Sequence, residues 1–156
     1  MVESGKKWGI EGFSPMFLGE FEYRIDDKGR MPFPPRFRPY FKDGVIVAPG
    51  QEKCLSVYTI AEWKKMADRL EAGGLPPSKL RKLNRALFAT AFHTNIDAQG
   101  RINLPTTLMA YAGLNGDIVV AGANSYIELW DKAAWDAEKN ADLADAWQII
   151  ESLERH

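Results

Sequence analysis

Five cations lie close together in the first third of the chain, where they could bind a polyanion. They are Arg24, Lys28, Arg30, Arg36 and Arg38. Arginine and lysine neutralise backbone phosphates, and arginine also forms bidentate hydrogen bonds with guanine edges in the DNA major groove, each worth about 1 to 3 kcal/mol of discrimination. These residue types therefore indicate a contact with double-stranded DNA.

Some of these cations surround a turn that the chain contains twice. The motif Asp-x-x-Gly-Arg between apolar flanks occurs at Ile25–Met31 and again at Ile96–Ile102. The similarity continues through two later strand patterns, which end near Trp63 in one copy and Trp135 in the other. Such self-similarity at a fixed spacing indicates an internal duplication, so we expect two related units.

Residues shared by both copies are candidates for a structural role. The shared pairs are Asp26 with Asp97, Gly29 with Gly100, and Arg30 with Arg101. An Asp and an Arg that flank a tight turn can form an ion pair across it, while Gly accepts the backbone conformation of the turn. Arg30 and Arg101 are therefore candidates both for a structural ion pair and for DNA contact.

Residues present in only one copy indicate what that copy does. Arg24, Lys28, Arg36 and Arg38 of the first copy correspond to Asn95, Gln99, Thr107 and Met109 of the second. The first copy is therefore predicted to contact DNA. Its cations lie among four carboxylates, and the dilution of charge suggests that several subunits must bind together. These carboxylates are Glu20, Glu22, Asp26 and Asp27.

The charge of the chain is segregated along its length. The net charge of −1 combines a basic part, residues 1–116 with 17 Lys and Arg against 12 Asp and Glu, and an acidic part, residues 117–156 with 3 against 9. The basic middle helix near residues 79–85 is read either as a solvated face or as an extension of the phosphate contacts.

No combination of residues indicates catalysis or a cofactor. The chain has no phosphate-binding Gly-x-x-x-x-Gly-Lys motif, and it has too few histidines and cysteines for a metal cluster. Cys54 is expected to be a buried structural thiol. We therefore expect no enzyme activity, no metal, no cofactor and no small-molecule substrate.

The pattern divides the chain into five segments. Residues 1–15 are expected to be a flexible extension, 16–75 the first unit, 76–92 a linking helix, 93–148 the second unit with its C-terminal helix, and 149–156 a tail. No apolar run is long enough to span a bilayer, and no signal peptide is visible, so a cytoplasmic protein is expected.

Each unit is predicted to be mainly β. In the first unit, a strand over residues 17–25 turns back into 31–33, and two further strands precede a helix that Thr59 caps. The second unit repeats this plan, with a short helix at 106–111 and a final acidic helix from Asp131 to about Trp147.

Taken together, these motifs resemble the MraZ family of bacterial transcriptional regulators. The resemblance rests on Met16-Phe17-Leu18-Gly19, on the two Asp-x-x-Gly-Arg turns, and on Glu128-Leu129-Trp130 before Trp135. It implies an α+β, mainly β fold of tandem AbrB/SpoVT-like swapped-hairpin units with accompanying helices. It also implies a ring-shaped homo-oligomer, associated with the nucleoid, that binds repeated promoter boxes upstream of the division and cell-wall gene cluster. Positions 24, 30 and 38 coincide with basic positions around the DNA-binding hairpin of AbrB-like proteins.

A second reading of the same fold stays open. AbrB-like folds also serve as protein-interaction or antitoxin-type modules without specific DNA readout of their own, and a fold does not decide a function. A mobility shift with the protein's own upstream region would separate the two readings.

Overall fold

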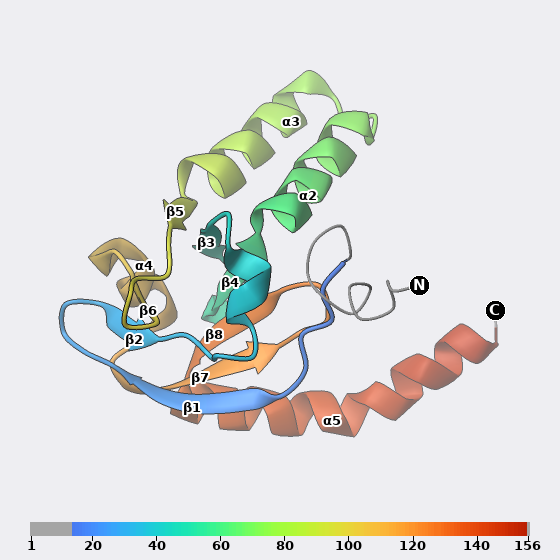
Figure 1. Cartoon of the computed structure of the whole chain (residues 1–156). Coiled ribbons are helices and arrows are strands. Elements are labelled where there is room, and N and C mark those ends of the chain that lie inside the picture. The colour runs from blue at the N-terminus through green and yellow to red at the C-terminus, as the bar shows by residue number, and fades with distance from the viewer. Residues whose placement is uncertain (1–13, 156) are drawn as a thin grey trace, which may run out of the picture.

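The computed structural model describes residues 14–155 and shows two antiparallel sheets with accompanying helices (Figure 1). The larger sheet has six strands, in the spatial order β1 (Glu20–Ile25), β7 (Gly116–Gly122), β8 (Ile127–Asp131), β4 (Leu55–Thr59), β3 (Val45–Pro49) and β5 (Phe92–Thr94). The smaller sheet pairs β2 (Arg30–Pro32) with β6 (Arg101–Asn103). The α+β, mainly β fold class is confirmed.

The two copies of the repeat exchange strands within the chain. Hairpins β3–β4 and β7–β8 form the middle of the large sheet, where β4 pairs with β8. Strand β1 of the first copy then pairs with β7 of the second, while β5 of the second copy pairs with β3 of the first. Each copy therefore completes the sheet of the other.

The predicted pairing of residues 17–25 with 31–33 is wrong. Only the turn is closed locally, by a hydrogen bond from the Asp26 N–H to the Arg30 carbonyl oxygen (3.1 Å), and β1 begins at Glu20. Beyond the turn, β2 joins the other sheet, because Met31 and Ile102 lie opposite each other and bury their side chains in the shared core. Burying both side chains in one place stabilises the exchanged arrangement.

Aromatic side chains close the core beside the small sheet. Phe17 contacts Phe37 (ring centroids 5.0 Å apart), and Phe33 contacts Phe41 (4.9 Å). Phe33 and Phe37 follow β2, and Phe41 ends the short helix η1 (Arg38–Phe41), so their packing fixes the segment that carries Arg36 and Arg38.

Two helices of the middle segment form a hairpin that projects from the sheet (Figure 1). Helix α2 (Ile60–Ala72) begins where the Thr59 hydroxyl accepts a hydrogen bond from the Glu62 N–H, as predicted (3.1 Å). Helix α3 (Pro77–Leu83) continues into one π-helical segment, η3 (Asn84–Ala89), and strand β5 follows. The predicted linking helix over 76–92 therefore ends earlier, at Ala89. The remaining short helices are η2 (Gln51–Lys53) and α4 (Thr106–Ala112).

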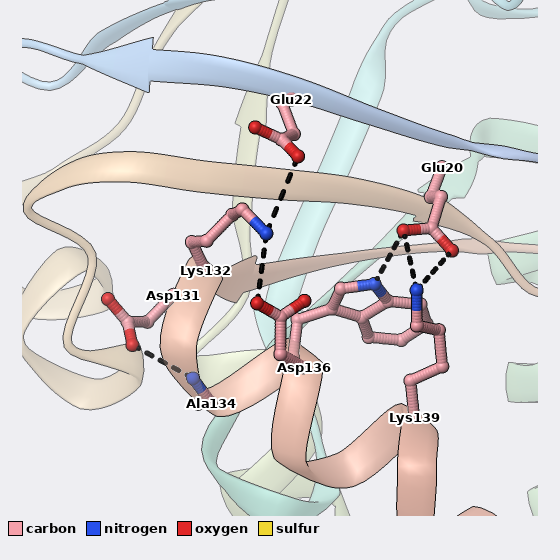
Figure 2. Close-up of polar contacts among 8 residues, drawn as sticks. Glu20, Glu22, Asp131, Lys132, Ala134, Asp136 and Lys139 are labelled. Carbon is pink, nitrogen blue, oxygen red and sulfur yellow. Dashed lines mark hydrogen bonds and ion pairs between the residues drawn. The ribbon is translucent and has the colours of Figure 1, made fainter.

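Helix α5 (Lys132–Glu154) crosses the sheet beside β1 and is held there by ion pairs (Figure 2). Its first turn is capped by Asp131, whose carboxylate accepts a hydrogen bond from the Ala134 N–H (3.1 Å). The helix continues to Glu154, so the predicted end near Trp147 and the predicted tail over 149–156 are wrong. Residues 148–154 contain no Gly or Pro that would end a helix.

The described residues settle two smaller points. Cys54 is fully buried, and burial raises the pKa of its thiol to about 12, so the thiol is inert as expected. Every helix within residues 14–155 is too short or too polar to traverse a bilayer. The predicted flexible extension of residues 1–15 lies almost wholly outside the described residues.

Candidate nucleic-acid interface

The small sheet brings the two repeated arginines onto one surface. In the antiparallel register Arg30 lies opposite Asn103, and Pro32 lies opposite Arg101. Because alternate residues of a strand share a face, these four side chains point outward while Met31 and Ile102 point into the core. The Arg30 and Arg101 side chains are 41% and 38% exposed. We call the outward face of β2 and β6 the ribbon face.

The first turn is held by one carboxylate. Asp26 Oδ1 accepts hydrogen bonds from the N–H groups of Lys28 (3.0 Å) and Arg30 (2.9 Å), and Asp26 Oδ2 accepts one from Arg30 Nε (2.7 Å). The carboxylate therefore fixes both the backbone of the turn and the direction of the Arg30 guanidinium. The backbone N–H of Arg30 is the main reason that the pKa of Asp26 lies below 3.8.

The second turn has the same geometry. Asp97 Oδ1 accepts from the N–H groups of Gln99 and Arg101 (both 2.9 Å), and Asp97 Oδ2 accepts from Arg101 Nε (3.2 Å). The N–H of Arg101 likewise lowers the pKa of Asp97 below 3.8. The predicted ion pair across the turn is thus present in both copies, and it leaves the outer nitrogens of each guanidinium free of the paired carboxylate.

Replacing Asp97 by Asn should lower the melting temperature at pH 7 by a few degrees, because Asn keeps the shape but loses the ion pair. The folded-state pKa of Asp97 is lowered, so its contribution is present above 3.8 and is lost as the pH falls through the lowered value. The difference in melting temperature between the two proteins should therefore vanish in strong acid. Thermal unfolding followed by circular dichroism measures it.

Two further substitutions test this prediction, one as a control and one at the partner of Asp97. Asp27→Asn, at the exposed residue that follows Asp26 in the first turn, should leave the melting temperature unchanged. Arg101→Ala should lower it as Asp97→Asn does. A fully stable Arg101→Ala protein that no longer binds DNA would show that Arg101 does not act through folding.

A long side chain of one copy covers the turn glycine of the other copy. The covering residue is Arg38 in the first copy and its counterpart Met109 in the second. A Cβ atom on Gly100 would lie 2.5 Å from Arg38 Cζ, and one on Gly29 would lie 3.1 Å from Met109 Sδ. Arg38 also donates a hydrogen bond from Nε to the Phe33 carbonyl oxygen (2.9 Å). The structure therefore places the Arg38 guanidinium across the second turn, directly before Arg101, whereas its counterpart Met109 covers the first turn.

The remaining predicted cations lie around this surface at different places. Lys28 is exposed on the first turn, and Arg36 is exposed in the bend before η1. Arg24 lies apart from the ribbon face, because it pairs with Asp117 of β7 (2.6 Å) on the same side of β1 as Glu20 and Glu22. The structure thus gathers Arg30, Arg38 and Arg101 and leaves Arg24 at the margin.

Two of the four carboxylates that were expected to dilute the positive charge, Glu20 and Glu22, are paired with α5 and do not lie on this surface. Glu20 accepts hydrogen bonds from Trp135 Nε1 (3.0 Å) and from Lys139 (3.2 Å), and Glu22 pairs with Lys132 (3.4 Å), all on α5 (Figure 2). The hydrogen bond from Trp135 is the main cause that lowers the pKa of Glu20. Only Asp26 and Asp27 of the four carboxylates remain near the cations of the first turn.

Asn103 is a candidate that the sequence analysis missed. It is exposed and lies on the ribbon face opposite Arg30. Its amide is able to make paired hydrogen bonds with adenine in the major groove. Its spacing of two residues from Arg101 was the available signal, because that spacing in a strand predicts a common face.

Comparison with known proteins matches this chain to one family over both copies of the repeat. The family model with the description "MraZ protein, putative antitoxin-like" matches residues 16–82 and 87–146. The chain belongs to the MraZ family. The two matched ranges contain both turns and both strands of the ribbon face.

Relatives within the MraZ family cover most of the chain. A protein of Dehalococcoides mccartyi named transcriptional regulator MraZ is 57% identical over 142 residues, which are 90% of this chain and 100% of that protein. Proteins with the same name from Salinispora arenicola and Frankia alni are both 41% identical, over 83% and 78% of this chain and 94% and 85% of their own lengths. A transcriptional regulator is not a class of enzyme.

Proposed function

We propose that this MraZ family member is a transcriptional regulator that binds double-stranded DNA in a sequence-specific manner through the ribbon face and its two turns. The observation that carries this proposal is the exposed pair Arg30 and Arg101 on one two-stranded ribbon, with Arg38 laid over the second turn. A two-stranded ribbon is narrow enough to enter the major groove. The regulator name of the relatives supports the same role.

The ribbon residues and their neighbours divide the work of binding. Arg30, Arg101 and Asn103 face outward and reach base edges, while Lys28, Arg36 and Arg38 contact the flanking phosphates. Arg24 reaches phosphates only if it leaves Asp117, so its contribution is the smallest. Such a division between positioning and reading contacts is typical of DNA-binding proteins.

The proposal includes the target and the assembly. The protein is a homo-oligomer, arranged as a ring, that acts in the cytoplasm at the nucleoid on repeated boxes upstream of the division and cell-wall gene cluster. The alternative is an antitoxin-type module that works by protein contact, which the description of the family model favours. This alternative predicts no specific shift of the upstream DNA.

Arg38→Ala should weaken binding of a box-containing duplex about tenfold, because it removes one guanidinium from the surface. Met109→Ala is the matched control: it uncovers the other turn glycine but removes no charge, so affinity per folded molecule should stay unchanged. Electrophoretic mobility shift with the upstream region measures both. Equal losses in the two variants would contradict a role of the Arg38 guanidinium in DNA contact, and no shift of any upstream fragment would support the alternative.

A further inference from the structure

A cavity lies beside the ribbon face, between two elements of the second copy. It is lined by residues of β5 and of the segment that joins β6 to α4, which lie on the same side of the large sheet (Figure 1). Its volume is about 410 Å³, within the range of about 300 to 1,000 Å³ that is usual for small-molecule sites. We call this cavity the β5–β6 pocket. The lining residues are Phe92, Thr94, Asn103, Leu104, Pro105 and Thr106.

The lining of the β5–β6 pocket restricts the charge of its ligand. Metal sites in proteins are built mainly from carboxylate, imidazole and thiolate groups, and phosphate sites contain arginine or lysine. None of the six lining residues carries any of these groups. Three of them are apolar and three are polar but uncharged. The ligand that fits is therefore neutral, with apolar surface and with hydrogen-bonding groups.

The polar groups of the pocket are available to a ligand. Within residues 14–155, the side chains of Thr94, Asn103 and Thr106 form no hydrogen bond with another residue. Together they offer two hydroxyl groups and one carboxamide. Asn103 Oδ1 lies 3.2 Å from the place that a Cβ atom on Gly29 would occupy, so this amide lies between the pocket and the first turn.

The chemistry of these groups fits a nucleobase. The donor and acceptor of an Asn carboxamide match one edge of adenine, and a Thr hydroxyl serves either as donor or as acceptor. Phe92 supplies an aromatic ring, and aromatic rings stack on the faces of bases. A sugar carries hydroxyl groups around its whole ring, so it would place polar groups against Phe92, Leu104 and Pro105 without hydrogen bonds.

We propose that the β5–β6 pocket binds the adenine ring of a free nucleoside. The Asn103 carboxamide pairs with the edge of the ring that carries the amino group, and the hydroxyls of Thr94 and Thr106 bind its remaining polar atoms. The apolar lining residues contact the faces of the ring. The pocket is a ligand site separate from the cationic residues of the ribbon face.

Occupation of the pocket has a consequence for DNA binding, and this consequence rests on the proposed function. Asn103 belongs both to the pocket and to the ribbon face, and one carboxamide cannot pair with two adenines at once. The wall of the pocket is also tied to the first turn, because the Leu104 N–H donates a hydrogen bond to the Gly29 carbonyl oxygen (2.8 Å). Adenosine and a box-containing duplex should therefore weaken each other's binding by the same factor.

Calorimetric titration of the full chain without DNA tests the pocket. The probes are adenosine, inosine and ribose. Adenosine should bind, and inosine should bind about tenfold more weakly, because an oxygen replaces the amino group that Asn103 accepts. Ribose alone should not bind. Equal binding of adenosine and inosine, or no binding of adenosine at millimolar concentration, would overturn the proposal.

Two variants with matched controls locate the site. Asn103→Leu should weaken adenosine binding about tenfold, and Thr106→Val about fivefold. Asn95→Leu and Thr107→Val make the same changes at exposed neighbours outside the lining, so both should bind adenosine normally. Circular dichroism verifies folding, and Thr106→Val keeps the test decisive if Asn103→Leu does not fold. Adenosine binding that neither lining variant weakens would place the ligand elsewhere and refute the pocket.

An unpaired base of a nucleic acid is another source of the same chemistry. A single-stranded oligothymidine with one adenine distinguishes this source from a free nucleoside. Slot-like binding of adenosine itself, weakened by Thr106→Val, supports the proposal. If the oligonucleotide binds in a manner that depends on Thr106 and adenosine does not bind, the assignment to a free nucleoside is wrong.

Failure of the pocket and failure of the regulator role are distinguishable. Saturating adenosine should weaken the binding of a box-containing duplex about tenfold in the unmodified protein and should have no effect on Asn103→Leu. An unchanged DNA affinity in the unmodified protein would contradict the competition for Asn103. A protein that binds adenosine but never shifts DNA would refute the regulator role alone, whereas DNA binding without adenosine binding would refute the pocket alone.

Discussion

Gly29→Ala is expected to destabilise the fold by about 3 to 5 kcal/mol, a large part of the stability of an ordinary domain. The backbone φ of Gly29 is +84°, and an added Cβ would lie 2.2 Å from the Leu104 carbonyl oxygen. That oxygen belongs to the backbone and cannot rotate away, so β2 and the segment after β6 would have to separate. Urea denaturation of the variant measures the loss.

Gly100→Ala provides the matched comparison. Its φ of +79° imposes similar strain, about 1 to 2 kcal/mol, but the added Cβ would meet the end of the flexible Arg38 side chain. We expect Gly100→Ala to stay folded and to displace the Arg38 side chain. The free energy of DNA binding should therefore be weakened by more than the free energy of unfolding is lowered. If Gly29→Ala costs no more stability than Gly100→Ala, the close approach at Leu104 does not constrain the fold.

A duplex with three phased boxes is expected to bind the unmodified protein at least about a hundredfold more tightly than a duplex with one box. One ribbon face should bind weakly, because Asp26 and Asp97 are each paired with a guanidinium that we propose to contact DNA. Tethering several such sites to one duplex raises the effective concentration of each later contact. Affinity should also fall steeply with salt, since many phosphates are neutralised at once.

A duplex that carries the same three boxes at unphased spacings is the control for this gain. Its boxes cannot all be contacted by one particle, so it should bind only slightly better than the single box, by the statistical factor of about three equivalent sites. Fluorescence anisotropy over a range of salt concentrations measures all three duplexes. A hundredfold gain retained by the unphased duplex would show that the gain does not come from simultaneous contacts of one oligomer.

The sequence was sufficient to predict local structure and the chemistry of the turns. The duplicated Asp-x-x-Gly-Arg motif predicted two turns with internal ion pairs, and the structure has Asp26 with Arg30 and Asp97 with Arg101. Thr59 with Glu62 predicted where α2 begins. These features depend on residues only a few positions apart, so periodicity and capping preferences describe them well.

Features that depend on distant residues were not predictable in this way. Nothing within residues 17–33 specifies that β1 pairs with β7, because the alternating pattern of a strand fixes its faces and not its partner. The same holds for Glu20, whose pairing with Trp135 and Lys139 removes it from the cationic surface. The end of α5 is a different case, because residues 148–154 contain no Gly or Pro and the sequence therefore carries the signal that the helix continues.

Strand exchange between the copies has a consequence for how the protein is made. Strand β1 leaves the ribosome early, but β7, its only ladder partner within residues 14–155, is among the last elements synthesised. The nascent chain therefore carries an unpaired strand until translation is nearly finished, and contacts between such distant residues form slowly. Neither half can acquire a complete sheet alone, so folding is expected to be a late, all-or-none event.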